Sequence, residues 1–259
     1  MIGAIIGDAI GSAYEFERIK TKEFQLITAD SIWTDDTVLT LATADCLLYG
    51  SDYTEAYKRW FHWYPVVKGS YGRSFTEWAK SKVSRPYYSC NNISAIRVVP
   101  VAYAFDNLKD VLEEAERSAE VTHNHPEGIK GAQAVAAAIF LARTGATKDA
   151  IAELVTNIFG YDLSIPFEKL QPSYQYSQLV QDTVPAAITA FLASKDFEDA
   201  IRNAVSLGGD ADTLAAITGA IAEAFYPKIS KELRDWCWAL LDEAQQDLIN
   251  EFKAEFVQS

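Results

Sequence analysis

Two short acidic segments have the residue types and spacing that a metal site needs. Residues 34–37 read TDDT, and residues 208–213 read GGDADT. Each segment places two carboxylates and at least one threonine hydroxyl just before an apolar helical run. Carboxylates at this density repel one another unless a cation lies between them. Because the donors are all oxygen, with no His or Cys nearby, the segments favour a hard ion such as Mg²⁺, Mn²⁺ or Ca²⁺ over zinc.

Helix capping is the alternative explanation for each segment taken alone. Asp36 and Asp210 lie close to expected helix starts, where an aspartate caps the helix and the helix dipole stabilises its charge. Capping needs one carboxylate, so it leaves the second carboxylate of each segment unexplained. Gly208 and Gly209 also allow a tight turn and a close approach to a ligand. If the four aspartates converge, two divalent cations about 3.5–4 Å apart balance them better than one.

Helical periodicity dominates the chain, and we expect one all-α domain over residues 1–259. Apolar residues recur at helical spacing after each acidic segment, and the second of these helices should end near Pro227. Further helices are expected over 131–143, 148–158, 182–194, 196–206 and, as one long element, 231–256. A short extended piece is expected at 25–28. Loops are expected over 68–74, 85–92 and 160–174.

Composition favours a globular protein without an extended nucleic-acid groove. The 259 residues are 49% hydrophobic, which allows a substantial core, and the net charge of −13 is opposite to what duplex binding needs. No stretch approaches the ~18 uncharged apolar residues of a membrane span. The N-terminal segment lacks a basic region and contains Asp8 and Glu15, unlike a signal peptide. The three cysteines are widely spaced, so we expect a reducing, cytoplasmic location.

Five segments resemble the ADP-ribosylglycohydrolase family and follow one another in the family's order. They are GAIIGDAIGSAYEFE at 3–17, WTDDT at 33–37, THNHPEGIKGA at 122–132, QDTVPAAITAFL at 181–192 and SLGGDADTLAAITGAIAEAFYP at 206–227. The resemblance implies a compact, orthogonal all-α fold with two Mg²⁺ or Mn²⁺ ions in a central cleft. It also implies hydrolysis of the N- or O-glycosidic bond between ADP-ribose and a protein or other acceptor, with ADP-ribose as the product.

The resemblance also implies roles for individual residues by motif match. The metal ligands would be Thr34, Asp35, Asp36, Asp210, Asp212 and Thr213. Glu15 matches the family's mobile glutamate beside the metals, and Asp35, Asp36 or Glu15 would orient the attacking water. Substrate contacts would come from Gly72, Ser89, Asn92, His125 and Gly209.

The segment that resembles the family's phosphate loop departs from the family pattern. Asn91 and Ile93 stand where the family commonly has glycine, and isoleucine does not easily take a positive φ. We therefore expect a different backbone path and altered phosphate contacts. This departure favours one alternative, a non-catalytic protein of the same fold that binds ADP-ribose or protects a partner. A prenyl-diphosphate enzyme is a further alternative, but its DDxxD signature needs an acid where Leu39 stands.

Overall fold

The computed structural model describes residues 1–257. Within them the regular secondary structure consists of helices joined by loops, and there is no sheet. The helices are α1 (Ile2–Gly11), α2 (Asp35–Tyr49), α3 (Tyr53–Trp63), α4 (Arg73–Lys80), α5 (Ile93–Arg97), α6 (Val101–Ala104), α7 (Leu108–Glu120), α8 (Pro126–Arg143), α9 (Lys148–Phe159), α10 (Phe167–Ser173), α11 (Val180–Leu192), α12 (Phe197–Ser206), α13 (Ala211–Phe225), α14 (Lys231–Leu240) and α15 (Glu243–Phe256). The expected all-α class is confirmed. One domain over 1–259 stays a prediction, and its last two residues lie outside the described part.

Several element boundaries differ from the expected ones. The long helix expected over 231–256 is divided into α14 and α15, because Asp242 and Gln245 form a capping box that starts a new helix. Helix α10 lies inside a segment expected to be a loop. Residues 25–28 form no strand. In the described part of the chain, no helix is long and apolar enough to cross a bilayer.

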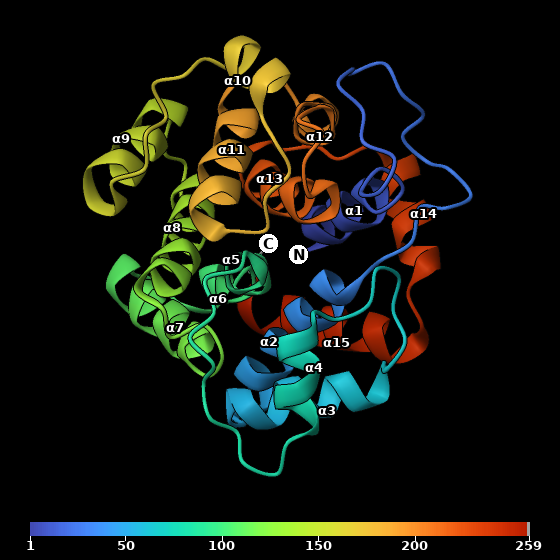
Figure 1. Ribbon diagram of the computed structural model, residues 1–259, viewed down its shortest axis with the longest axis vertical. Helices are drawn as coiled ribbons and strands as arrows, with labels where there is room; N and C mark the ends of the chain where they lie inside the picture. The colour runs from blue at the N-terminus through green and yellow to red at the C-terminus, as the bar shows by residue number, and fades with distance from the viewer. Residues whose placement is uncertain (258–259) are drawn as a thin grey trace.

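Helices α1 and α13 lie side by side at the centre of the molecule, with α2 and α11 beside them (Figure 1). Gly3, Gly7 and Gly11 are four residues apart and therefore lie on one face of α1. A Cβ atom on Gly7 would lie 2.0 Å from the carbonyl oxygen of Ala215, and one on Gly11 would lie 2.2 Å from that of Ala211. The two backbones are therefore in direct contact, and only glycine fits on this face of α1.

The two helices are antiparallel, which determines which of their ends lie together. The end of α1 at Gly11 lies against the start of α13 at Ala211, while Gly3 lies against Gly219. At the opposite end, the carboxylate of Glu223 accepts hydrogen bonds from the amino terminus (2.7 Å) and from the backbone N–H of Gly3 (2.8 Å). The segment that follows α1 and the acidic segment that precedes α13 are thereby brought together.

A methyl group added at Gly7 is expected to destabilise the protein. In Gly7→Ala the new Cβ has no room against Ala215, so α1 and α13 must separate, and we expect the unfolding free energy to fall by about 1–3 kcal/mol. Denaturant titration followed by circular dichroism measures this change. Gly72→Ala is the control, because none of the described residues lies within 4 Å of its Cβ position. Equal stability of the two variants would show that the glycine face is not required.

Candidate active site

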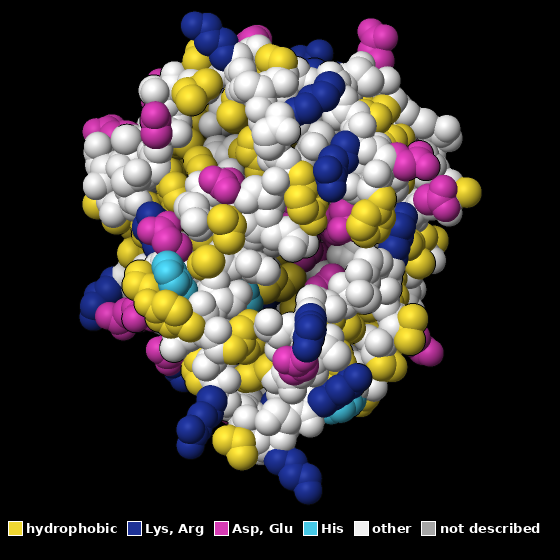
Figure 2. Space-filling view, viewed as in Figure 1, with side chains coloured by type: hydrophobic (Ala, Val, Ile, Leu, Met, Phe, Trp, Pro, Cys, Tyr) yellow, Lys and Arg dark blue, Asp and Glu magenta, His cyan; other side chains and the backbone are white. Residues whose placement is uncertain are grey.

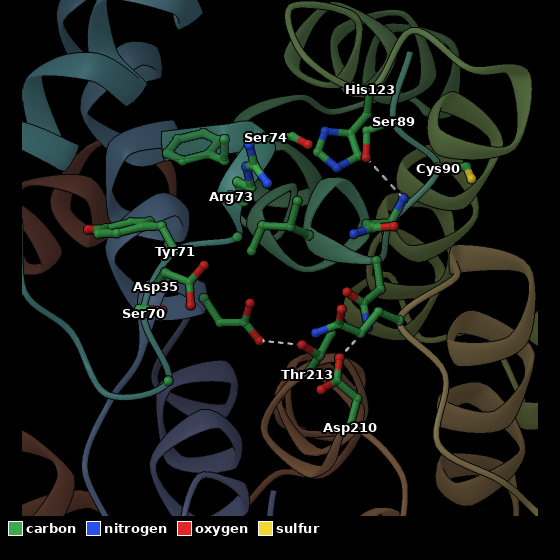
Figure 3. Close-up of a pocket in the computed structure, with 18 of the residues that line it drawn as sticks. Asp35, Ser70, Tyr71, Arg73, Ser74, Ser89, Cys90, His123, Asp210 and Thr213 are labelled. Atoms are coloured by element: carbon green, nitrogen blue, oxygen red, sulfur yellow. Dashed lines mark hydrogen bonds between the residues drawn. The ribbon is translucent and has the colours of Figure 1, made fainter. Parts of the chain in front are cut away.

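A cavity of about 580 Å³ collects the residues of both acidic segments. Figure 2 shows carboxylates inside a hollow on this face, and Figure 3 shows Asp35 and Asp210 at one end of the cavity. The walls come from residues 69–75, residues 87–93, His123 and Gln178. The acidic end is lined by Glu15, Asp35, Asp36, Asp210, Asp212 and Thr213. Packing of α1 against α13 thus brings together carboxylates that lie about two hundred positions apart in the sequence.

Carboxylate oxygens in this region form two overlapping groups. Asp8, Asp36 and Asp212 offer one oxygen each within 4.8 Å of one another, and so do Glu15, Asp210 and Asp212. Asp212 belongs to both groups. The Oε2 atom of Glu15 is buried and has no hydrogen-bond partner among residues 1–257. Oxygen donors in two groups that share one aspartate fit a pair of hard divalent cations.

Burial shifts the protonation of these carboxyl groups. The pKa of Glu15 rises to about 7, chiefly through burial and then through the charge of Asp210. The pKa of Asp35 rises to about 8, again through burial and then through Asp8. Burial also raises the pKa of Asp36 and of Asp212 well above the ordinary range. Without a cation the cluster therefore retains protons, and a bound divalent cation would displace them.

Asp8 is a site residue that the sequence analysis did not identify. One of its oxygens accepts hydrogen bonds from the backbone N–H groups of Thr34 (2.9 Å) and Thr37 (3.1 Å) and from the hydroxyl of Thr37. The other accepts a hydrogen bond from the hydroxyl of Thr34 (2.8 Å). Because both oxygens are occupied in this way, Asp8 orients the start of α2. The signal in the sequence was a lone acidic residue within the apolar run 2–11.

Two further hydrogen bonds orient the proposed metal ligands. The hydroxyl of Thr213 donates to Asp36 at 2.8 Å, so the two acidic segments are directly joined. The side-chain amide of Asn92 donates to Asp210 at 2.7 Å and to the hydroxyl of Thr183 at 3.2 Å. Asn92, expected to contact the substrate, lines the cavity but directs its amide at an acidic residue. Figure 3 shows the bond to Asp210 as a dashed line.

The 89–97 segment keeps a regular path despite its departures from the family pattern. Neither Asn91 nor Ile93 has a positive φ, and Ile93 begins helix α5. Asn91 pairs instead with Leu179 in an isolated antiparallel bridge, and the backbone N–H of Asn92 donates to the carbonyl of Gln178 at 2.9 Å. Glycine is therefore not needed at these two positions. Among the described non-glycine residues, positive φ occurs at Ser70 and Tyr88, both on the cavity wall.

The other expected substrate contacts fall in different places. Gly72 and Ser89 line the cavity. Gly209 does not, and its Cβ position lies 2.5 Å from the ring of Tyr174, so it allows close packing there. His125 also lies outside the lining, where its Nδ1 atom accepts a hydrogen bond from the backbone N–H of Glu127 (3.0 Å) and caps α8. The histidine in the lining is His123 (Figure 3).

His123 presents a neutral ring at the cavity wall. Arg97 donates from Nη2 to the hydroxyl oxygen of Thr122 at 2.8 Å, and that oxygen lies 2.8 Å from Nδ1 of His123. If Thr122 donates its own hydrogen to Nδ1, the ring hydrogen lies on Nε2. Burial, and secondarily Arg97, lowers the pKa of His123 well below its ordinary value. Nε2 is buried and has no hydrogen-bond partner within residues 1–257.

Comparison with known proteins supports the resemblance seen in the sequence. The family model for ADP-ribosylglycohydrolase matches residues 1–257. The ADP-ribosylarginine hydrolase Tri1 of Pseudomonas putida is 29% identical over 258 residues, covering 87% of this chain and 69% of that protein. The ADP-ribosyl-dinitrogen reductase glycohydrolase of Rhodospirillum rubrum is 25% identical over 247 residues, covering 87% and 83%. A solved ADP-ribosylglycohydrolase-related protein complex shares the fold, with a TM-score of 0.75, 24% identity, and coverage of 98% of this chain and 96% of that one.

The stability of the cation-free protein is expected to fall as the pH rises from about 5 to about 8. In the unfolded chain these carboxyls titrate near pH 4, whereas the folded chain keeps protons on Glu15 up to a pKa of about 7 and on Asp35 up to a pKa of about 8. The folded state thus binds more protons than the unfolded state in this window, so the unfolding free energy decreases with pH.

Thermal unfolding in EDTA measures this dependence, and we expect a fall in Tm on the order of 5 °C across the window. Saturating Mg²⁺ or Mn²⁺ should remove most of the fall, because a cation replaces the protons. A Tm that rises with pH in EDTA would contradict the burial of the carboxyl cluster.

Proposed function

The chain belongs to the ADP-ribosylglycohydrolase family, and from this premise we propose that it hydrolyses the glycosidic bond between ADP-ribose and an acceptor. The observation that supports the proposal most directly is the pair of carboxylate groups that share Asp212 at one end of the cavity. Burying unpaired carboxylates destabilises a fold, so the cluster indicates bound cations. Catalysis that uses cations accounts for the cluster.

The cations would be held by Thr34, Asp35, Asp36, Asp210, Asp212 and Thr213, and we propose that they are two Mg²⁺ or Mn²⁺ ions. When bound, such ions supply positive charge that orients sugar hydroxyls and makes a water molecule more acidic. The buried, unpartnered oxygen of Glu15 fits this assignment. Asp8 and Asn92 would not bind the cations but would orient the ligands, since Asp8 holds the start of α2 and Asn92 holds the carboxylate of Asp210.

The chain's own carboxylates would move the proton and stabilise charge. Glu15, Asp35 and Asp36 line the cavity, and we propose that one of them takes a proton from the attacking water. Cleavage at the anomeric carbon develops positive charge on the ribose, which these fixed negative charges stabilise. An acidic end of the cavity is therefore suited to the sugar, and the remainder of the cavity to the nucleotide.

The rest of the cavity has the features that a nucleotide diphosphate needs. A volume of about 580 Å³ is within the usual range for ligand sites. Helix α4 begins just after Gly72 at the cavity wall, so its first N–H groups are available to an anion. Ser89 and His123 lie on the same wall. We propose that these groups contact the phosphates or the adjacent ribose.

A panel of ADP-ribosylated substrates tests the proposed activity. We expect ADP-ribose release from at least one of ADP-ribosyl-arginine, ADP-ribosyl-serine and ADP-ribosylated nucleic acid with Mg²⁺ or Mn²⁺, and none with EDTA. Asp36→Asn and Glu15→Gln should each lower kcat by about 100-fold or more. Chromatography of released ADP-ribose is the measurement. Full turnover in both variants would refute the assignment, and binding without any release would favour the non-catalytic alternative.

Variants of His123 and His125 test which of the two histidines contacts the substrate. His123→Ala removes an N–H donor from the cavity, and we expect KM to rise about tenfold, as for one lost hydrogen bond. His125→Ala removes a helix cap, so it should mainly lower the unfolding free energy, by about 1 kcal/mol. Steady-state kinetics and denaturant titration of both variants separate the two roles. A larger rise in KM for His125→Ala than for His123→Ala would show that His125 contacts the substrate, as the sequence predicted.

A further inference from the structure

The ammonium group of Lys20 joins three segments of the chain behind the acidic cluster. Lys20 lies five residues after Glu15, on the segment that connects α1 to α2. Its Nζ atom donates to the carbonyl oxygens of Tyr174 (2.6 Å) and Gln171 (2.9 Å) and to that of Leu207. Three backbone acceptors around one ammonium use all of its donors.

These acceptors lie at the C-terminal ends of two helices. Tyr174 follows the last residue of α10, and Leu207 follows the last residue of α12. Carbonyls at a helix C-terminus lack partners inside the helix and carry partial negative charge. A lysine ammonium is therefore a favourable partner for both ends, and it holds them at a defined separation.

A reciprocal bond fixes the backbone at Lys20 as well. The side-chain amide of Gln171 donates to the carbonyl of Lys20 at 2.6 Å and to that of Ser206 at 2.9 Å. Lys20 and Gln171 thus each bind the other's main chain. The connecting segment is tied to α10 and to the end of α12 through both its side chain and its backbone.

The turn that precedes Asp210 packs against this junction. Gly208 has a φ of +64°, and its Cβ position lies 3.0 Å from Cε of Lys20. The Cβ position of Gly209 lies 2.5 Å from the ring of Tyr174, whose carbonyl accepts from the same ammonium. The turn is therefore enclosed between the Lys20 side chain and the Tyr174 ring, and its path determines where the Asp210 carboxylate points.

We propose that Lys20 is a positioning residue for the divalent cation site. It sets the 208–210 turn and ties that turn to the segment that carries Glu15. Glu15 and Asp210 contribute to the same group of carboxylate oxygens, so one ammonium controls the placement of both. This inference rests on the proposed function, because the site that Lys20 positions is the one proposed to hold the cations.

Lys20→Met, Lys20→Arg and Lys22→Met test the proposal. Lys22 is the matched control, since it lies on the same segment but pairs with Asp199. Hydrogen–deuterium exchange of residues 205–213 in metal-free protein reports on the turn, and calorimetric titration with MnCl₂ reports on the site. We expect Lys20→Met to exchange faster there and to bind Mn²⁺ about tenfold or more weakly. Lys20→Arg should recover part of both properties, and Lys22→Met should match the unmodified protein.

The two measurements test different parts of the proposal. Unchanged exchange at 205–213 in Lys20→Met overturns the positioning role, whatever the metal result. Faster exchange with unchanged Mn²⁺ affinity overturns the link between Lys20 and the cation site. If the unmodified protein takes up no Mn²⁺, the proposed function fails, while the exchange result still decides whether Lys20 positions the turn. If Lys20→Met does not fold, Lys20→Gln carries the same comparison.

Discussion

The backbone contact between α1 and α13 is the constraint on which the rest of the structure depends. Gly7 and Gly11 allow the helices to touch without intervening side chains, and the pairing is antiparallel. The segment after α1 and the segment before α13 therefore emerge at the same end. Glu15 lies on the first of these segments and Asp210 on the second. Wider spacing between the helices would separate these carboxylates, and the proposed cation site would not form.

The acidic residues at this end divide into two classes by how their oxygens are satisfied. Asp8 accepts hydrogen bonds from both Thr34 and Thr37, which lower its pKa, although burial still raises that pKa to about 6. Glu15 has a buried oxygen without a partner in the described chain, and its raised pKa reflects the cost of leaving it charged there. Desolvated carboxylates of the second class need a proton or a cation. The proposed ligands Asp36 and Asp210 lie between these two cases, because each accepts one side-chain hydrogen bond, from Thr213 and from Asn92 respectively.

The opposite end of the cavity is lined by neutral polar groups and by Arg73 rather than by carboxylates. Burial and the charge of Arg97 lower the pKa of His123, which keeps its ring neutral, and the start of α4 offers backbone N–H groups. A chain with a net charge of −13 can still accept a diphosphate through such oriented dipoles, because they act over a short range. Lys20 does not face the cavity in this role, since its ammonium group donates to backbone carbonyls at the end of α10.

The sequence by itself determined the all-α class, the two acidic segments and the family, because helical periodicity and short motifs are local properties of the chain. It also located Glu15, although only through the family resemblance. Tertiary structure alone decided that Asn92 turns to Asp210, that His123 rather than His125 lines the cavity, and that Asp8 holds α2. These outcomes depend on the direction of a side chain relative to helices far away in sequence. The residues that neighbour each side chain in the sequence do not show which of these distant elements it will meet.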